Sequence, residues 1–385
     1  MNANSSRSKT TREQGWSWRR AKDGVPFLAC ASLLAISTIQ PETDLLRVAK
    51  GKTRVGRELR HVETGGYYEQ LIGKSGLSER DAVVDDENGQ PPPGWVPSGA
   101  SGIVDSDPTY LRWRMKPNLD MVWNGAPFHT NSRGYRTPEV SLDKPADVYR
   151  IVVIGSSNTM GHGVTDDEAY PRLLETWLQG LPDLGRRVEV VNLAVSGDSP
   201  SRRLLRMSME AERYQPDWIL CDASILDPSL EERHLDAIVH TDPRPTVPLE
   251  YVAAALRRSK VSAGDSPEEF QRKIRFELKA LLDGAYGGWG DFSRRTGLPV
   301  TVVMLPRADE KRDNPIMQKL MHGYVRRYRL DCLDLSAAFG DLRVDEFRVS
   351  AWDKHPSVKG HQVIFQALRD ALAARGTLPG LRLPE

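Results

Sequence analysis

The strongest constraint on the fold is the alternation of short apolar runs with helix-length periods from residue 148 towards the C-terminus. Continuous apolar runs of this length are typical of parallel strands that are buried on both faces of a sheet. When such runs are separated by helical segments, the pattern predicts consecutive βα units around one parallel sheet. We therefore expect an α/β domain with three layers, α/β/α.

The predicted elements follow one another at short intervals. The strands are expected at residues 149–154, 187–193, 218–221, 300–305 and 330–335. The helices are expected at residues 167–179, 200–214, 267–295, 315–327 and 358–374. A long insertion, residues 228–266, follows the third strand. Helical periodicity at 251–258 and 268–282 indicates helices that cover the site.

The chain before this domain is predicted to be an extension. We divide the sequence into a disordered basic tail (1–24), an N-terminal extension (25–146), the α/β/α domain (147–376) and a C-terminal tail (377–385). The tail is polar and charged with few large apolar residues, a composition that favours disorder. Residues 81–107 include a Pro-rich run typical of a linker, and residues 110–121 and 127–136 predict short strands or an extended arm.

Residues 25–39 are apolar and follow a basic region, which is the pattern of a signal or signal-anchor segment. The stretch is shorter than the roughly 20 residues that span a bilayer, and it contains Pro26 and Ser32. An amphipathic or buried helix is the alternative. Membrane association through residues 25–39 therefore stays open, as does the choice between a cytoplasmic and an exported or anchored protein.

Charge and cysteine content exclude several functional classes. The 53 basic residues balance 52 acidic ones, so nothing indicates a nucleic-acid partner. The three cysteines, Cys30, Cys221 and Cys332, are widely spaced and form neither a metal-ligand motif nor a disulfide framework. Nothing in the composition defines an oligomeric state.

The turn after the first predicted strand is the first candidate for chemistry, because ligands of such sheets bind at the carboxyl ends of the strands. It contains Gly155, Ser156 and Ser157, and continues to Gly161 and His162. Glycine permits sharp turns and close approach of a ligand. A phosphate-binding loop would need lysine after the second glycine, where histidine stands instead. Alone, the turn is explained as well by backbone geometry as by catalysis.

Asp353 and His355, just before the last predicted helix, favour the catalytic interpretation of the Ser157 turn. A serine nucleophile needs a base, and the base needs a carboxylate that fixes its tautomer. An Asp–His pair in a loop is by itself more typical of a local hydrogen bond or a helix cap. Together with Ser157 at a strand end, the pair predicts a Ser–His–Asp triad.

These separated blocks resemble the SGNH (GDSL-type) hydrolases, over roughly residues 148–375. Gly155-Ser156-Ser157 resembles the first block, GDS, with Ser157 as the nucleophile. Residues 192–197 resemble the second block, in which Gly197 donates a backbone N–H to the oxyanion. Residues 353–356 resemble the last block, with His355 as base and Asp353 as its orienting carboxylate. Residues 131–136 resemble the lead-in of bacterial members.

The resemblance implies a flavodoxin-like parallel sheet and a serine esterase that works through an acyl-enzyme. It implies an oxyanion hole formed by the N–H groups of Ser157 and Gly197. The implied substrate is a small-molecule or carbohydrate ester, such as an acetylated carbohydrate, and the implied mechanism requires no cofactor. A metal site formed by Asp222, Asp227 and His355 is not expected, because these residues lack a ligand spacing.

Two positions depart from the family pattern. Ser156 replaces the Asp beside the nucleophile, which mainly alters local hydrogen bonding. Leu226 stands where the family has the oxyanion Asn, and Ser224 where it has Gly. A leucine side chain cannot donate a hydrogen bond, and losing one oxyanion donor typically costs about 10²–10³ in rate. Asn158, Ser196 and Ser224 are the neighbouring polar residues that are candidates for the missing donor.

Two alternative functions remain open at this stage. The same triad could transfer the acyl group to a sugar hydroxyl, as in an O-acyltransferase. The replacement at Leu226 could instead mark a non-catalytic relative that binds glycan or acts as a scaffold.

His162 lies beside the nucleophile and is expected either to line the pocket or to face solvent. His361 is expected to cap or pack the last helix, and the pair Arg202-Arg203 is expected on a solvated helix face.

Overall fold

A five-stranded parallel sheet forms the centre of the fold. The computed structural model describes residues 94–308 and 314–384. Its central strands are β5 (Val148–Ile154), β6 (Arg187–Asn192), β7 (Trp218–Ala223), β8 (Val300–Met304) and β9 (Asp331–Asp334). They are ordered β6-β5-β7-β8-β9, and every neighbouring pair is parallel. In chain order this is 2-1-3-4-5, the flavodoxin-like order. The predicted fold class is confirmed.

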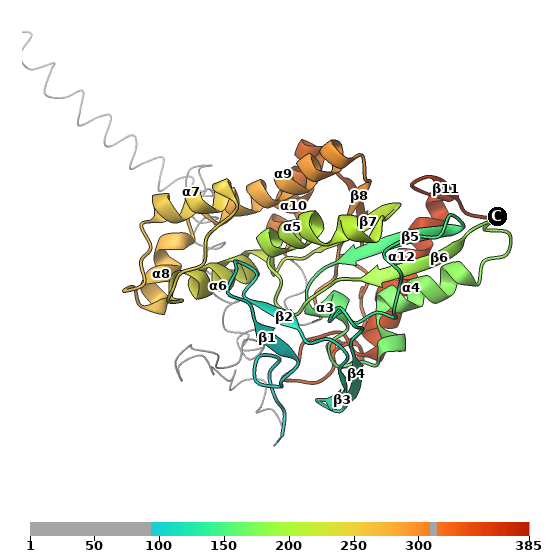
Figure 1. The fold of residues 1–385 in the computed structure, drawn as a ribbon, viewed down its shortest axis with the longest axis horizontal. Coiled ribbons are helices and arrows are strands. Elements are labelled where there is room, and N and C mark those ends of the chain that lie inside the picture. The colour runs from blue at the N-terminus through green and yellow to red at the C-terminus, as the bar shows by residue number, and fades with distance from the viewer. Residues whose placement is uncertain (1–93, 309–313, 385) are drawn as a thin grey trace, which may run out of the picture. The chain divides into compact units, whose positions relative to one another are not determined.

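Helices cover both faces of the sheet (Figure 1). One face packs against α4 (Tyr170–Gln179) and α12 (Val358–Arg375). The other packs against α5 (Pro200–Met209), α9 (Leu278–Thr296) and α10 (Pro315–Tyr328). Every residue of β5, β7 and β8 is buried, which explains why these strands are continuous apolar runs in the sequence.

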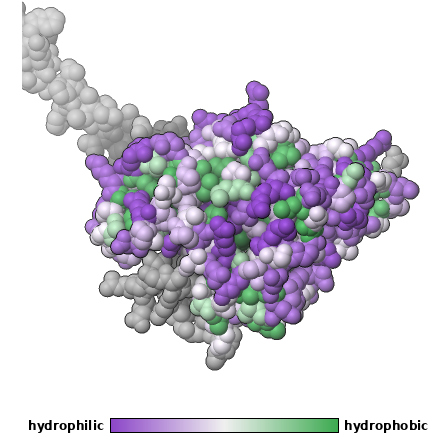
Figure 2. All heavy atoms as spheres, viewed as in Figure 1, coloured by the Kyte–Doolittle hydropathy of each residue, from purple (hydrophilic) through white to green (hydrophobic). Residues whose placement is uncertain are grey.

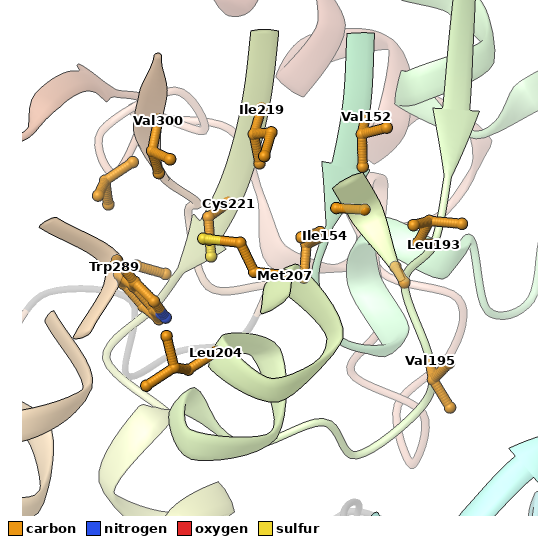
Figure 3. Close-up of a cluster of buried hydrophobic side chains, with 14 of the residues drawn as sticks. Val152, Ile154, Leu193, Val195, Leu204, Met207, Ile219, Cys221, Trp289 and Val300 are labelled. Atoms are coloured by element: carbon orange, nitrogen blue, oxygen red, sulfur yellow. The ribbon is translucent and has the colours of Figure 1, made fainter. Parts of the chain in front are cut away.

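Alternate side chains of β5 enter the two hydrophobic layers. Ile151 and Val153 belong to the layer with α4 and α12, whereas Val152 and Ile154 belong to the layer with α5. Figure 3 shows the second layer, with Val152 and Ile154 on the strand and Met207 on the helix that covers it. Each such buried aliphatic side chain stabilises the fold by roughly 1.5–3 kcal/mol, so β5 is firmly held up to the residue before Gly155.

The region after β7 differs from the prediction. Part of the predicted insertion forms α6 (Asp227–Val239), which begins with proline in its first turn. The single helix predicted at 267–295 is wrong, because the chain forms α8 (Pro267–Ile274) and α9 with a break between them. The helix predicted at 251–258 is present as α7 (Glu250–Ser259). Helices α6, α7 and α8 share a third hydrophobic cluster.

Two antiparallel hairpins precede the sheet. One pairs β1 (Val104–Ser106) with β2 (Trp113–Met115), and the other pairs β3 (Asp120–Trp123) with β4 (Ala126–His129). The short strands predicted at 110–121 and 127–136 are confirmed in part, because residues 130–136 form no strand and β1 lies in the segment predicted as a linker. Figure 1 shows both hairpins near α3 (Ser157–Met160), which follows β5. The hairpins thus cover the end of the sheet where the sequence predicts the site.

The remaining elements are short. They are η3 (Asp166–Glu168), η4 (Ala211–Tyr214), α11 (Val344–Phe347), β10 (Thr377–Leu378) and β11 (Leu381–Arg382). The face drawn in Figure 2 is mostly hydrophilic, with an apolar patch over the β3–β4 hairpin, where Val122 is 67% exposed. No helix in the described part of the chain is long and apolar enough to cross a membrane. The predicted basic tail and the apolar segment 25–39 lie outside the described residues.

Candidate active site

Ser157 lies at the first position of α3, immediately after the turn that ends β5. The helix is one turn long and ends at Gly161, whose φ of 90° places it in the left-handed region that favours glycine. The N–H groups of Gly161 and His162 both donate to the Ser157 carbonyl at 3.1 Å. Ser157 is fully buried, and its hydroxyl has no hydrogen-bond partner among the described residues. The hydroxyl is therefore available to a base.

Asp222 of β7 holds this turn in place. Ile154 pairs with Cys221 across the sheet, so the next residue of β7 lies beside Gly155. The Asp222 carboxylate accepts hydrogen bonds from the Ser156 N–H at 2.9 Å and the Thr159 hydroxyl at 2.5 Å. A Cβ at Gly155 would overlap this carboxylate, which explains the glycine. Sequence reasoning missed this role, because it depends on a strand 66 residues away.

Asp222 is held in turn by Arg203 of α5. The Arg203 guanidinium is 3.1 Å from an Asp222 oxygen and 2.9 Å from an Asp227 oxygen. Burial disfavours its charge, but the two carboxylates outweigh burial and raise the pKa of Arg203. Burial raises the pKa of Asp227 to about 6, although Arg203 acts in the opposite direction. Arg202 and Arg203 are both completely buried, so the prediction of a solvated helix face is wrong.

The loop between α11 and α12, residues 348–357, brings Asp353 and His355 together, and we call it the acid–base loop. One carboxylate oxygen of Asp353 lies 2.8 Å from His355 Nδ1 and also accepts from the His355 N–H at 3.1 Å. A carboxylate only accepts, so this contact assigns the proton to Nδ1 and leaves Nε2 as the basic atom. Burial, reinforced by the nearby His361, lowers the pKa of His355 well below its usual value. The ring is therefore neutral at neutral pH, as a general base must be.

His162 contacts the other oxygen of the same carboxylate. His162 Nε2 lies 3.0 Å from Asp353 Oδ2, and the two histidine rings stack with centroids 3.8 Å apart. His162 is 1% exposed, so the alternative that it faces solvent is wrong. The edge of Trp123 from the β3–β4 hairpin packs on it at 4.5 Å. The only sequence signal for this role was its proximity to Ser157.

These three residues could also be considered as metal ligands. The ligand atoms of His162, Asp353 and His355 all lie within 4.8 Å of one another, and histidine and carboxylate are common zinc ligands. Each imidazole, however, makes its own direct hydrogen bond to a separate carboxylate oxygen. A cation would have to replace both of these protons. The arrangement thus fits a hydrogen-bonded acid–base group. Asp222 and Asp227, considered above as partners of His355, pair with Arg203 instead.

The two backbone donors expected in the oxyanion hole are the N–H groups of Ser157 and Gly197. Neither the Ser157 N–H nor the Gly197 N–H donates a hydrogen bond within residues 94–308 and 314–384. Gly197 has a φ of 74°, a conformation that glycine adopts without strain. Asn192, at the end of β6, ties the second block to α3, because its side chain donates to the Thr159 carbonyl at 2.9 Å and accepts from the Ala194 N–H at 3.1 Å.

Leu226 is buried at the start of α6, where the family pattern has the oxyanion Asn. Its N–H donates to the Ser224 hydroxyl at 3.2 Å, so Ser224 stabilises this turn. The two other candidates for a substitute donor are also buried. Among the described residues, the Asn158 carbonyl oxygen and the Ser196 hydroxyl have no hydrogen-bond partner. Both side chains are therefore available for contacts with a ligand.

His361 packs the last helix, as expected. It is fully buried on α12, and its Nδ1 accepts a hydrogen bond from the Tyr170 N–H at 3.3 Å. Burial, together with the charge of Arg136, lowers the pKa of His361 to about 3. The residue thus joins α12 to the start of α4 and holds the loop that carries the acid–base pair.

Comparison with known proteins gives a family match over the same region. The sequence pattern of the GDSL-like lipase/acylhydrolase family matches residues 153–363, more than half of the 385-residue chain. No curated protein matches the sequence.

Some solved structures also match this chain, at low identity. One is an alpha/beta hydrolase enzyme from the metagenome of Lake Arreo, Spain, with 20% identity over 60% of this chain and 97% of that chain and a TM-score of 0.39. Another is an acetylxylan esterase from Geobacillus stearothermophilus, with 16% identity, coverages of 58% and 94%, and a TM-score of 0.37. A third is a two-domain esterase active on acetylated mannans, with 14% identity, coverages of 62% and 51%, and a TM-score of 0.38.

Proposed function

We propose that this chain, which belongs to the GDSL-like lipase/acylhydrolase family, is an ester hydrolase with Ser157 as its nucleophile. His355 is the general base, and Asp353 is the carboxylate that orients it. The observation that carries the proposal is the buried hydrogen bond of 2.8 Å between Asp353 Oδ1 and His355 Nδ1. This bond fixes the tautomer in which Nε2 can accept a proton, and the resemblance of Gly155-Ser156-Ser157 to the first block of the family supports Ser157 as the nucleophile.

In the proposed mechanism, His355 Nε2 takes the proton of the Ser157 hydroxyl as its oxygen attacks the ester carbonyl carbon. The N–H groups of Ser157 and Gly197 bind the negative oxygen of the tetrahedral intermediate. The C–O bond of the ester then breaks, and His355 gives its proton to the departing alcohol. Water, deprotonated by His355, attacks the acyl-enzyme and releases the carboxylic acid. Asp353 stabilises the imidazolium in both steps, and no cofactor takes part.

The substrate we propose is an ester of a small acyl group, such as acetyl on a carbohydrate. The carbohydrate part follows from the family resemblance. The small acyl group has support from the site, because Ser157 is completely buried. Trp113 of β2 packs on the neighbouring Gly197 loop, where its indole N–H donates to the Ser196 carbonyl at 3.3 Å.

Covalent labelling tests the nucleophile directly. We expect a fluorophosphonate probe to modify the protein once, on the peptide that contains Ser157, as read by mass spectrometry. Ser157→Ala should abolish labelling, whereas Ser156→Ala should retain it, because the adjacent residue contacts Asp222 mainly through its backbone N–H. Labelling that survives Ser157→Ala would exclude this nucleophile. Absence of both labelling and p-nitrophenyl acetate turnover would favour a non-catalytic binding role.

The pH profile tests the base. The pKa of His355 is lowered from its usual value near 6.5, chiefly by burial. The neutral ring is the active form, so kcat/KM falls only when the pH drops below this lowered pKa. We therefore expect the acid limb of kcat/KM for p-nitrophenyl acetate to lie below pH 6.5. An acid limb at or above the pKa of an unperturbed histidine would contradict the assignment of His355 in its buried environment.

Acyl transfer to a hydroxyl is the second candidate function, and burial of the site favours it. Ser157 and His355 are 0% exposed and Asp353 is 1% exposed, so the structure shields the acyl-enzyme from bulk water. An acceptor sugar could then outcompete water for the acyl group. The ratio of acetylated acceptor to free acetate, measured with an oligosaccharide present, distinguishes a transferase from a hydrolase.

A further inference from the structure

We infer that His162 is a positioning residue for the reaction, which holds Asp353 and the ring of His355 in their working orientation. The inference rests on the proposed function, because it concerns the same acid–base pair. His162 would not touch the reacting atoms. It would act through the carboxylate that it shares with His355 and through direct contact with the His355 ring.

The first part of the argument is the division of the Asp353 carboxylate between two histidines. Oδ1 binds His355 Nδ1 at 2.8 Å, and Oδ2 binds His162 Nε2 at 3.0 Å. All three side chains are buried. Without His162, Oδ2 would be a buried acceptor that lacks this donor, which is unfavourable. Only the two bonds that Oδ1 accepts from His355 would then restrain the carboxylate, so the line from Oδ1 to Nδ1 would be held less firmly.

The second part is the stacking of the two rings. The His162 and His355 rings are 3.8 Å apart at an interplanar angle of 27°. The edge of Trp123 contacts His162 at an interplanar angle of 90°. His162 is thus held by Trp123 and packs along the face of the His355 ring. One hydrogen bond at Nδ1 leaves the plane of a histidine free to turn, whereas a stacked neighbour fixes that plane and the direction in which Nε2 points.

The third part is the position of His162 in the chain. Its N–H donates to the Ser157 carbonyl at 3.1 Å, so it belongs to the nucleophile turn. The next residue, Gly163, has a φ of 78°, and a Cβ there would overlap the side chain of Val349 in the acid–base loop. The two loops therefore meet at these residues. Through its hydrogen bond to Asp353, His162 connects the segment that carries the nucleophile with the segment that carries the base.

The contacts of His162 show which of its nitrogens donates. Nε2 faces a carboxylate and therefore carries a proton, while Nδ1 has no hydrogen-bond partner among the residues described. The bond to Asp353 is thus a donation from His162, which draws charge away from the carboxylate. If this donor is lost, Asp353 interacts more strongly with His355⁺ and raises the pKa of the base. The titratable groups beside His355 are Asp353, His162 and His361.

Two variants separate the two functions of the side chain. His162→Phe keeps a ring that can stack and loses the donor, whereas His162→Gln keeps a donor and loses the ring. We expect His162→Phe to lower kcat for p-nitrophenyl acetate by about 10–100-fold with KM nearly unchanged, because small misplacements of catalytic groups have effects of this size. The acid limb of kcat/KM in His162→Phe should move to higher pH. His162→Gln should restore the position of that limb and recover only part of kcat.

A matched control is available outside the site. His322 Nε2 also contacts an aspartate, Asp334, at 2.7 Å, but the pair is far less buried. His322→Phe should leave kcat and the pH profile unchanged. A purely structural role of His162 would lower the melting temperature of the His162 variants without moving the acid limb. A His162→Phe enzyme with the kcat and pH profile of the wild type would overturn the inference.

The outcomes for the inference and for the proposed function are distinguishable. Turnover that persists in Ser157→Ala would contradict the proposed function. Turnover that requires Ser157 but not His162 would contradict only the inference about His162. An NMR titration of the His355 ring tests the contact without any turnover, because His162→Phe should raise its pKa relative to the wild type and His162→Gln should not. An unchanged His355 titration in His162→Phe would contradict the inference even in an inactive protein.

Discussion

Asp353→Asn should lower kcat for p-nitrophenyl acetate by about 10⁴-fold, the size of effect that an amide in place of the orienting carboxylate produces in serine hydrolases. The amide nitrogen can donate to His355 Nδ1, which would then have to accept. The proton would move to Nε2, the atom that must receive the proton of Ser157. The geometry would persist, but the tautomer would be wrong. The imidazolium formed during catalysis would also lose its negative neighbour.

The substitution has a second consequence that is specific to this chain. His162 Nε2 donates to Asp353 Oδ2, so one amide group would face two imidazole nitrogens and could accept from only one of them. If the amide oxygen keeps His162, its nitrogen faces His355 and gives the wrong tautomer. If the oxygen keeps His355, the nitrogen opposes the N–H of His162. Either orientation impairs the pair.

The control for this prediction is Asp345→Asn. Asp345 lies on α11 close in sequence to the acid–base loop, and its exposed carboxylate pairs with Arg343. Exposed ion pairs contribute little, so this variant should retain wild-type kcat. Thermal unfolding of both variants would separate loss of structure from loss of chemistry. A folded Asp353→Asn protein with kcat within about tenfold of the wild type would contradict the role of Asp353 as orienting carboxylate.

The sheet could be predicted from the sequence because burial on both faces makes each strand a continuous apolar run. The helix α6 could not, because it lacks an apolar stripe on one side. Its polar residues Glu231 and His234 are buried together with its apolar ones. The break between α8 and α9 was equally hidden, since no glycine or proline occurs at residues 275–277. These errors arise where tertiary contacts, and not local preferences, determine the backbone.

The candidate site divides in the same way. Ser157, Gly197, Asp353 and His355 could be named from the sequence because each lies in a short block with a recognisable order. Their neighbours could not be named. The contact of Asp222 with the Ser156 N–H follows from the pairing of β5 with β7.

The buried partners of these residues are hidden for the same reason. The two carboxylates that neutralise Arg203 come from β7 and the start of α6. The contact of His162 with Asp353 joins two loops 191 residues apart. Periodicity within a segment carries no information on such partners.

Leu226→Asn should raise kcat for p-nitrophenyl acetate by about 10²-fold, and at most by the 10²–10³ that one oxyanion donor typically contributes. The position is where the family pattern has Asn, and the present hole has only the N–H groups of Ser157 and Gly197 as proposed donors. An amide N–H would add a third donor towards the developing negative charge. KM should change little, because the interaction strengthens mainly in the transition state.

The packing around Leu226 makes the exchange tolerable. Leu226 is 5% exposed but lies outside the three hydrophobic clusters that the described residues form, unlike its neighbour Ile225, which belongs to the first. Leu226→Ala is the matched control, since it removes the leucine without adding a donor, and it should show no increase in kcat. If Leu226→Asn is folded and no faster than Leu226→Ala, the hole already has its third donor. Ser196→Ala should then lower kcat by the same factor, because the Ser196 hydroxyl is a buried donor that has no hydrogen-bond partner in the described part of the site.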